Sequence, residues 1–431
     1  MAPPRRDAGL FPAPADHGDR RGGHRPALAR CWSTVPTTLA FRAATGSEPP
    51  RAPHFFQLNL WRDGPDTPSV LDLQSILAHV TEVGGSDLHV KGNSAPRVRV
   101  NGDLRPTPFP PVERQEVEEC LRVIMPVDRI EEFHRTGEAD FSLSIDGLGR
   151  FRGNAFRQRG SAAMVLRRVL PAAMSVLDLG LPPIVTRLAE ENRGMVLVTG
   201  PTGSGKTTTL AAMIDHINQT RSANIITIED PIEILHPDKR SVVCQREIGT
   251  DTRDYAQAMR RVLRQDPDVI LIGEMRDVET VSAALMAAET GHLVLSTLHT
   301  TNATETVNRI VDFFPPFQQA QIRLTLAGVL KGVISQRLVP HASGDGRVAA
   351  VEAMVVTGRV ADRIMDPHAA NGETIEELIA DGEYHGMQTF DQSLFALFKS
   401  GEVTLRAALA AATNPHDFRV ALQAAGLLAS S

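Results

Sequence analysis

The sequence predicts an α/β protein in which a small α+β domain precedes a larger domain built on a parallel β-sheet. Two observations predict the larger domain: short, almost wholly apolar segments alternate with helical ones, and a glycine-rich loop follows the first of these segments. Alternating apolar and polar residues between 140 and 169 predict antiparallel strands in the smaller domain. A chain of 431 residues has room for two or three domains with ordinary cores.

Residues 1–68 are expected to form a disordered tail, because they are rich in Pro, Gly and Arg and have no apolar period. An opening rich in Arg and Ala is also compatible with a transit peptide. The prolines and the acids Asp7, Asp16 and Asp19 argue against an amphipathic targeting helix. The simpler interpretations are a flexible tail or a start site assigned too far upstream, and no function is assigned to this segment.

Residues 69–170 are expected to form the small α+β domain. A stripe of apolar residues from Leu71 to Val80 has helical spacing and predicts the first helix. Asn101-Gly102 suits the tight turn of a hairpin between two short strands. A second helix and an antiparallel strand meander complete the domain.

Residues 183–431, after a linker at 171–182, are expected to form the larger domain. Its apolar runs are continuous rather than alternating, so they predict strands of a parallel sheet that is buried on both faces. Ligands of such sheets bind at the carboxyl ends of the strands. The runs end in these polar or small residues: Thr199-Gly200, Glu229-Asp230, Glu274 and His299. We therefore expect a ligand site at this edge of the sheet.

The segment from Gly200 to Thr207 fits the phosphate-binding pattern G-x-x-x-x-G-K-[ST] in full. Its glycines let backbone N–H groups turn toward phosphate, and the following helix offers its N-terminus to the anion. Lys206 is expected to pair with the β- and γ-phosphates, and the Thr207 hydroxyl is expected to bind Mg²⁺. The residues expected to bind the nucleotide here are Gly200, Pro201, Thr202, Gly203, Ser204, Gly205, Lys206, Thr207 and Thr208.

Acidic residues follow two of the predicted strands. Glu229, Asp230 and Glu233 cluster after one strand, and by themselves they fit solvated loop acids as well as a catalytic site. Beside a phosphate loop, however, a carboxylate is needed to position or deprotonate the attacking water. Glu274 ends another apolar run, where a carboxylate on the metal side is expected.

Two histidines, His292 and His299, stand at opposite ends of one apolar run. At a rise of about 3.3 Å per residue they lie roughly 20 Å apart along a strand, so they cannot both touch one phosphate. His299, at the carboxyl end, is the candidate γ-phosphate sensor. His292 by itself fits a structural or interface histidine.

Arginines gather in the second half of the small domain. Arg150 and Arg152 fall on one face of a predicted strand, and further arginines follow up to Arg168. Such a row is ordinarily a solvated sheet face. It would instead stabilise phosphoryl charge if this domain closes over the triphosphate, because the planar fork of arginine suits phosphate. The residues alone leave both interpretations open.

Composition argues against several other classes of protein. The net charge of −6 and the lack of a basic stripe with interleaved aromatic residues argue against a nucleic-acid partner. Cys31, Cys120 and Cys244 form no CxxC pair, so neither a disulfide framework nor a zinc site is expected. No apolar run approaches the roughly 18 residues that are needed to span a bilayer.

The C-terminal segment predicts a capped amphipathic helix. Thr389 and Gln392 match a capping box, and Phe390 and Leu394 begin an apolar face. Such a helix docks either on the chain's own core or on a neighbouring subunit, and we expect the former.

Four blocks in this order closely resemble the PilT/PilU group of the secretion ATPase superfamily, the hexameric motors of type IV pili. They are the phosphate loop (Walker A), the Asp box IITIEDPIE, the Walker B segment LRQDPDVILIGEMRD and the His box TGHLVLSTLHT. The segments GGSDLHV and GMQTFDQSLFALFKSGEVT also look like this group, so the resemblance spans about residues 71–427. It implies a PAS-like first domain and a RecA-like second domain, assembled as a six-membered cytoplasmic ring with ATP bound between the domains.

The resemblance also implies roles for single residues. Glu233 matches the catalytic base of the Asp box, and Glu274 matches the Walker B acid. His292 and His299 match the two His-box histidines, and His292 is expected to help bind the nucleotide, as are Glu229 and Asp230. Two residues match the arginines that the first domain brings onto the phosphates, namely Arg152 and Arg167.

The implied function is a homo-hexameric ATPase that hydrolyses Mg-ATP to drive type IV pilus retraction and twitching motility. The expected partners are an inner-membrane protein of the pilus base and a paralogous ATPase, at the cytoplasmic face of the membrane. The segment SQRLVPHASGDGRVAAVEAM has no four-cysteine zinc insertion, which relatives that act in pilus assembly or type II secretion usually carry. The absence of this insertion favours a role in pilus retraction over one in pilus assembly or type II secretion.

Two other functions stay open at this point. The segment GRVADRIMDPHAANGETIEELI departs from the AIRNLIRE-like motif of PilT, and the tail that follows looks more like PilU. An accessory, PilU-like nucleotide-binding partner of an active paralogue is therefore one alternative. A pilus-assembly or type II secretion ATPase is the other.

Overall fold

The structure is a computed structural model that describes residues 71–428 except 101, 170–172 and 370–371. The tail expected at residues 1–68 lies outside the described residues, as do residue 101 of the expected hairpin turn and part of the expected linker. None of the helices within the described part combines the length and the apolar character that a bilayer crossing requires.

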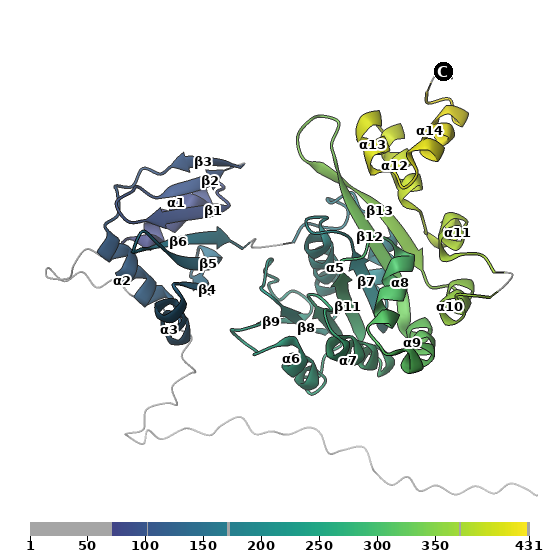
Figure 1. Ribbon diagram of the computed structural model, residues 1–431, viewed down its shortest axis with the longest axis horizontal. Coiled ribbons are helices and arrows are strands. Elements are labelled where there is room, and N and C mark those ends of the chain that lie inside the picture. Colours follow the sequence, from purple (N-terminus) through teal and green to yellow (C-terminus); the bar gives the residue numbers. More distant parts are fainter. Residues whose placement is uncertain (1–70, 101, 170–172, 370–371, 429–431) are drawn as a thin grey trace, which may run out of the picture. The chain divides into compact units, whose positions relative to one another are not determined.

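The first sheet has six strands in the order β3-β2-β1-β6-β5-β4, and every neighbouring pair is antiparallel (Figure 1). Val100 pairs with Asp103 across β2 and β3, which confirms the expected hairpin. The elements of this part are α1 (Leu73–Glu82), β1 (Asp87–Lys91), β2 (Arg97–Val100), β3 (Asp103–Pro106), α2 (Arg114–Ile124), α3 (Val127–Thr136), β4 (Glu138–Ile145), β5 (Gly149–Gln158) and β6 (Ser161–Arg168).

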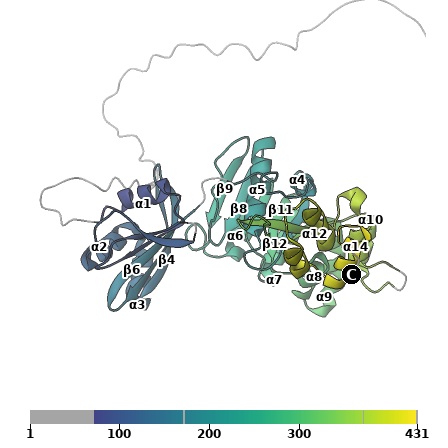
Figure 2. The same cartoon turned by 90° about the horizontal axis from the view of Figure 1, so that it is seen from above.

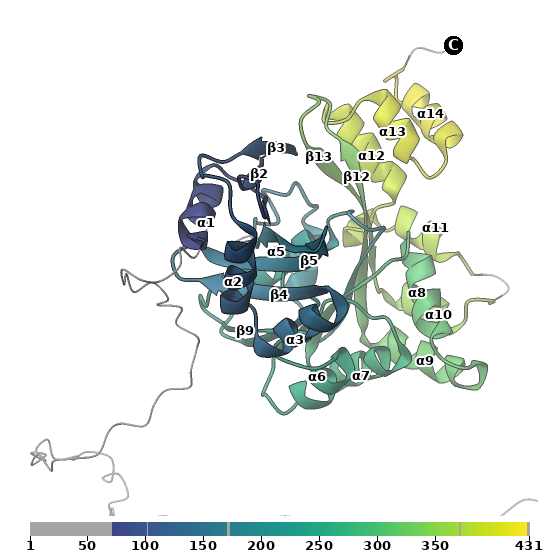
Figure 3. The ribbon, with the colours of Figure 1, turned by 60° about the vertical axis from the view of Figure 1, so that its left-hand side comes forward.

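One face of this sheet forms a core with the helices, which lie in front of the strands in Figure 3. Alternate residues of β4 and β5 are buried, and the Phe151 side chain is fully enclosed. The period of two places Arg150 and Arg152 on the other face, because they flank Phe151. The sequence pattern of this strand therefore sets which face carries arginine.

The second sheet has seven strands in the order β13-β12-β7-β11-β10-β8-β9. Every neighbouring pair is parallel except β12 and β13, which form an antiparallel hairpin at one edge. Its strands are β7 (Gly194–Thr199), β8 (Asn224–Glu229), β9 (Val242–Glu247), β10 (Val269–Ile272), β11 (Leu293–Leu298), β12 (Leu330–Pro340) and β13 (Arg347–Val355). The expected parallel sheet is confirmed.

Helices cover both faces of this sheet (Figure 2). Met195 and Leu197 of β7 pack in one core with α6–α9, whereas Val196 and Val198 pack in another core with α4 and α5. Burial on both faces explains why the strands are apolar at successive positions. The helices are α4 (Ile184–Ala189), α5 (Lys206–Thr220), α6 (Tyr255–Val262), α7 (Val278–Glu289), α8 (Ala303–Asp312), α9 (Pro316–Val329), α10 (Gly358–Met365) and α11 (Ile375–Ala380).

The C-terminal helices dock on the chain's own sheet. Phe390 and Leu394 are buried in one cluster with Val339 and Ala350 of β12 and β13, so the expectation of packing on the chain's own core is met. The capping box is present, because the backbone N–H of Thr389 donates to the side chain of its N3 residue at 2.8 Å. These elements are the 3₁₀ helix η1 (Glu383–His385), α12 (Phe390–Lys399), α13 (Leu405–Ala411) and α14 (Pro415–Ala424).

Candidate active site

A cavity of about 510 Å³ lies at the carboxyl ends of β7, β8, β10 and β11. Neighbouring strands of a parallel sheet end at the same edge, so residues far apart in the sequence meet there. The residues singled out from the sequence that line it are Thr202, Gly203, Gly205, Lys206, Thr207, Thr208, Glu229, Asp230, Glu233, Glu274 and His299.

The loop between β7 and α5 has a backbone that glycine adopts without strain. Gly200, Gly203 and Gly205 have positive φ angles of 143°, 78° and 93°. A Cβ on Gly200 would lie 2.5 Å from the carbonyl oxygen of Gln336, so no larger residue fits. α5 begins at Lys206, and its N-cap Gly205 has no side chain to bond the first N–H groups. These groups are available to an anion.

The Lys206 ammonium is held against its own loop. Its Nζ donates to the carbonyl oxygens of Gly200 at 2.8 Å and Pro201 at 3.1 Å, and this is how these two residues contribute to the site. Burial lowers the pKa of Lys206, and the negative charges of Glu274 and Glu233 oppose that shift. A partly desolvated ammonium attracts phosphate more strongly than a hydrated one, because water screens the attraction less.

Glu274 lies between two basic side chains. Its Oε2 accepts a hydrogen bond from Arg276 Nε at 2.7 Å, and its Oε1 lies 3.1 Å from His299 Nε2. The hydrogen bond to Glu274 is the main reason that the pKa of Arg276 is raised. Arg276 Nη1 also lies 3.7 Å from Asp230 Oδ2. One linked set of polar contacts therefore joins the ends of β8, β10 and β11.

The two glutamates of the Asp box have different surroundings. Glu229 Oε1 accepts hydrogen bonds from Thr227 Oγ1 at 2.6 Å and from Gln245 Nε2 at 3.1 Å. Burial raises the pKa of Glu229 in spite of these bonds. The Glu233 side chain is 50% exposed and lines the cavity. Glu233 is therefore the more exposed acid of this pair.

Arg152 and Arg167 lie opposite each other on β5 and β6, and Arg167 lies opposite Asp87 on β1. Arg167 Nε donates to Asp87 Oδ1 at 2.7 Å. Burial raises the pKa of Asp87, but its hydrogen bonds, led by that from Arg167, together with the charge of Arg167 outweigh burial and lower it. Both arginines line a second cavity of about 490 Å³ rather than the first. Arg152 Nη1 is nevertheless 3.9 Å from Glu233 Oε1.

Two further residues that were singled out from the sequence, His292 and Ser204, do not line the first cavity. The structure does not bring His292 to the cavity: its Nδ1 lies 2.9 Å from the Ala287 carbonyl and 3.2 Å from Thr290 Oγ1, at the end of α7. β11 separates it from His299, as the strand rise requires. Ser204 is 3% exposed and lies inside the phosphate loop instead of on the cavity wall.

Thr207 and Glu274 could hold a magnesium ion, because both line the cavity and offer the oxygen ligands that Mg²⁺ prefers. Within the described residues, no cluster of three or more His, Cys, Asp or Glu side chains is arranged to hold a metal ion. A hydroxyl and one carboxylate fit an Mg²⁺ site that phosphate and water oxygens complete, as in nucleotide-hydrolysing enzymes.

The family model of the type II/IV secretion system proteins matches residues 64–382. The chain belongs to this family. It is 43% identical over 348 residues to the type IV pilus retractation ATPase PilT of Pseudomonas aeruginosa, which covers 81% of this chain and 100% of that protein. It is 39% identical over 355 residues to the type IV pilus ATPase PilU of the same species, covering 82% and 92%.

A solved structure agrees with these relatives. The crystal structure of the pilus retraction motor PilT with bound ADP matches with a TM-score of 0.73 at 43% identity, covering 80% of this chain and 98% of that chain. The resemblance stated from the sequence blocks and the α/β fold are thereby confirmed. This member of the secretion family is a P-loop ATPase and binds nucleotide.

The cavity of this secretion-family ATPase also contains residues that the sequence analysis did not single out: His236, Tyr255, Arg276 and Arg347. Arg276 stands two residues after Glu274 in GEMRD, and that spacing was the available signal. The Tyr255 hydroxyl lies 3.0 Å from where a Cβ on Gly273 would be, so glycine at position 273 leaves room for the tyrosine. Arg347 comes from β13, which no sequence block marks.

Proposed function

We propose that this ATPase is the motor of type IV pilus retraction, and that it hydrolyses Mg-ATP to drive twitching motility. One observation carries the proposal. The phosphate loop, the acids after β8 and β10, and His299 converge on one cavity in a chain that resembles PilT over the full length of that protein. A nucleotide-binding pocket without the acids would support binding alone, whereas this set supports hydrolysis.

The phosphate loop binds the triphosphate in this proposal. The N–H groups at the start of α5 and the Lys206 ammonium would contact the phosphates, and Thr207 and Glu274 would hold the magnesium ion. Mg²⁺ bound there supplies positive charge that neutralises the phosphate oxygens. Glu229 and Asp230 line the same cavity and would face the nucleotide there.

Glu233 is the proposed general base, because its carboxylate lines the cavity and is half exposed, so water can reach it. It orients the attacking water and takes its proton. Arg152, 3.9 Å from Glu233, and Arg167 beside it stabilise the charge that develops on the γ-phosphate. His299 senses that phosphate through its contact with Glu274.

The proposed assembly is a homo-hexameric ring that acts on an inner-membrane protein of the pilus base, from the cytoplasmic side. His292, which lies away from the cavity, would then serve an interface between subunits or a structural role. A paralogous ATPase is a further proposed partner.

An accessory role is the second candidate, and the 39% identity to PilU over 92% of that protein favours considering it. An accessory partner would bind nucleotide and join a ring with an active paralogue. The complete set of acids in the cavity favours the self-sufficient motor.

Complementation tests the proposal directly. The full-length chain is expressed in a piliated bacterium whose own retraction ATPase gene is deleted, and twitching is measured on agar. Restored twitching by the parental chain, and none by Lys206→Ala, is the expected result. Twitching that returns only when a second, active paralogue is co-expressed supports the accessory role instead.

A further inference from the structure

Strand β9, with the sequence VVCQRE, forms an edge of the second sheet and pairs there with β8. Gln245 and Glu247 are two residues apart and therefore share one face of this strand. Both side chains bind the segment 232–236, which carries Glu233 and follows β8.

The Gln245 amide makes three hydrogen bonds. Its Nε2 donates to the Ile234 carbonyl at 2.9 Å and to Glu229 Oε1 at 3.1 Å, and its Oε1 accepts from the backbone N–H of His236 at 2.9 Å. A carbonyl can only accept and a backbone N–H can only donate, so these partners fix which way the amide points. A side chain that both donates and accepts at its tip is required here.

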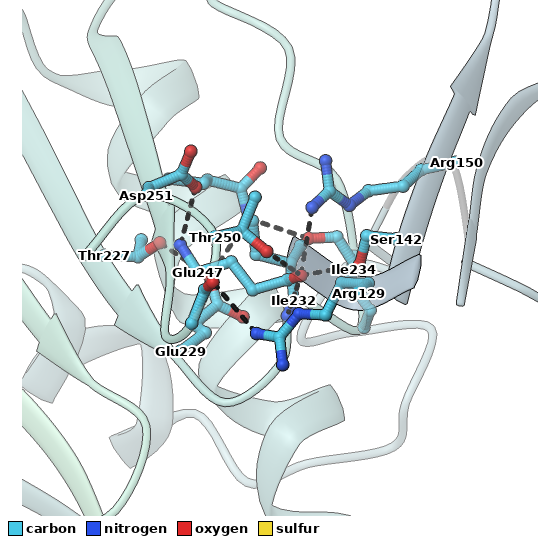
Figure 4. A network of polar contacts seen from close by, with 12 residues as sticks. Arg129, Ser142, Arg150, Thr227, Glu229, Ile232, Ile234, Glu247, Thr250 and Asp251 are labelled. Carbon is cyan, nitrogen blue, oxygen red and sulfur yellow. Dashed lines mark hydrogen bonds and ion pairs between the residues drawn. The ribbon is translucent and has the colours of Figure 1, made fainter. Parts of the chain in front are cut away.

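The Glu247 carboxylate holds the other end of the segment (Figure 4). Its side chain is 4% exposed, and its Oε2 accepts from the backbone N–H of Ile232 at 3.1 Å. Its Oε1 accepts from Ser142 Oγ at 2.5 Å and from Thr250 Oγ1 at 3.2 Å, and Arg150 Nη2 lies 3.0 Å from Oε2. A buried carboxylate with this many partners has little freedom to move.

The segment is therefore fixed at alternate residues, Ile232, Ile234 and His236, by side chains of β9. The Ile232 and Ile234 side chains are also buried, at 3% and 5% exposed. Glu233 lies between the fixed residues Ile232 and Ile234, and its own side chain is half exposed. Both of its backbone neighbours are thus tied down while its carboxylate lines the nucleotide cavity.

We propose that Gln245 and Glu247 are positioning residues that hold segment 232–236 so that the Glu233 carboxylate is aimed at the attacking water. This inference rests on the proposed role of Glu233 as the general base. A base displaced by about 1 Å loses on the order of a hundredfold in rate even when substrate binding is intact. Gln245 and Glu247 therefore affect turnover, whereas nucleotide binding depends on the phosphate loop.

The main test uses Gln245→Met in the full-length chain, because Met keeps the length of the side chain and removes its three hydrogen bonds. We expect kcat for ATP to fall about 10- to 100-fold, with the KM for ATP and the Kd for ADP within about twofold of the parental values. Cys244→Ser is the matched control, since Cys244 is the exposed neighbour on the opposite face of β9, and it should keep the parental kcat. An unchanged kcat in Gln245→Met, or an equal loss in both variants, overturns the proposal.

Gln245→Glu keeps the proposal testable if the Met variant does not fold. It preserves volume but loses the donors to Ile234 and Glu229, so the same loss of kcat with little change in KM is expected. Thermal unfolding of each variant identifies the folded ones. A folded Gln245→Glu chain with the parental kcat would contradict the proposed positioning role of Gln245.

A double-variant cycle separates this inference from the proposed function. If Gln245 acts through Glu233, then Glu233→Gln with Gln245→Met should turn over no more slowly than Glu233→Gln alone. A further 10- to 100-fold loss in the double variant would show that Gln245 acts by another route, and the inference would fail while the role of Glu233 stands. If Glu233→Gln alone turned over at the parental rate, Glu233 would not be the general base, and the inference would fail as well.

Discussion

His299 Nε2 lies 3.1 Å from Glu274 Oε1, so the residue that follows β11 contacts the acid that follows β10. The two strands are parallel neighbours, and their ends meet at the edge where the phosphate loop lies. Because Glu274 also binds Arg276, His299 and Arg276 share one carboxylate. A change of charge at the γ-phosphate would reach both basic groups through Glu274.

Replacing His299 with Ala removes this contact and is expected to lower kcat about tenfold, which corresponds to about 1.4 kcal/mol in the activation barrier. The affinity for ADP should change less than about twofold, because the phosphate loop is untouched. Steady-state ATP turnover and ADP titration measure the two effects. His416→Ala, which removes an exposed imidazole on α14, is the control. Equal rates in all three chains would exclude His299 from turnover.

Lys206→Ala is expected to weaken ADP binding at least about tenfold, because a charge-assisted contact to phosphate in a partly desolvated site is lost. Isothermal titration of the purified chain with ADP measures this directly. Lys399→Ala removes an exposed lysine at the end of α12 and should bind ADP normally. If Lys206→Ala keeps the parental affinity, the loop is not the phosphate site.

Arg152→Ala is expected to reduce kcat by about 100- to 1,000-fold, the range for loss of one group that stabilises transition-state charge. Arg157→Ala is a control on the same strand, since Arg157 pairs with Glu118 at 2.9 Å instead of approaching the Asp box. Single-turnover ATP hydrolysis compares them. If both substitutions cost the same, the arginines of β5 act through the stability of the sheet and the specific role of Arg152 is lost.

Burial of His236 should make the free energy of unfolding depend on pH. Its side chain is 9% exposed, and burial lowers its pKa from 6.5 to about 4. Between these pH values the unfolded chain carries a proton on His236 that the folded chain lacks, so the free energy of unfolding falls as the pH is lowered through this window. The full effect is on the order of 3 kcal/mol.

Thermal unfolding at about pH 7.5 and at about pH 5 checks this expectation. On going from the higher to the lower pH, the parental chain should lose more stability than His236→Gln, because glutamine at position 236 does not titrate. Identical losses in the two chains would show that His236 is protonated equally easily in the folded and unfolded states.

The central strands and the phosphate loop could be predicted because local sequence determines them. β7, β8, β10 and β11 are apolar at successive positions, and this pattern indicates a sheet buried on both faces. The carboxyl end of each strand then had to carry the site residues. The cavity lining follows from that topology.

Edge elements could not be predicted in the same way. β9 has the burial pattern of a partly exposed edge strand, and its polar residues Gln245 and Glu247 look like a solvated segment until the Asp-box loop lies against them. Tyr255 and Arg347 reach the cavity only through tertiary packing, so no spacing in the sequence marks them. For Arg167, the pairing with Asp87 depends on the register of β1 and β6, which local sequence does not give.

The role of Glu233 is tested most directly by ATP turnover of purified full-length Glu233→Gln beside the parental chain, with the mass in solution recorded with and without nucleotide. We expect a parental hexamer that hydrolyses Mg-ATP, and a variant that forms the same assembly and binds ADP normally but loses on the order of a hundredfold or more in kcat. A variant that hydrolyses ATP at the parental rate would contradict this role, because Glu233 would then not act on the attacking water.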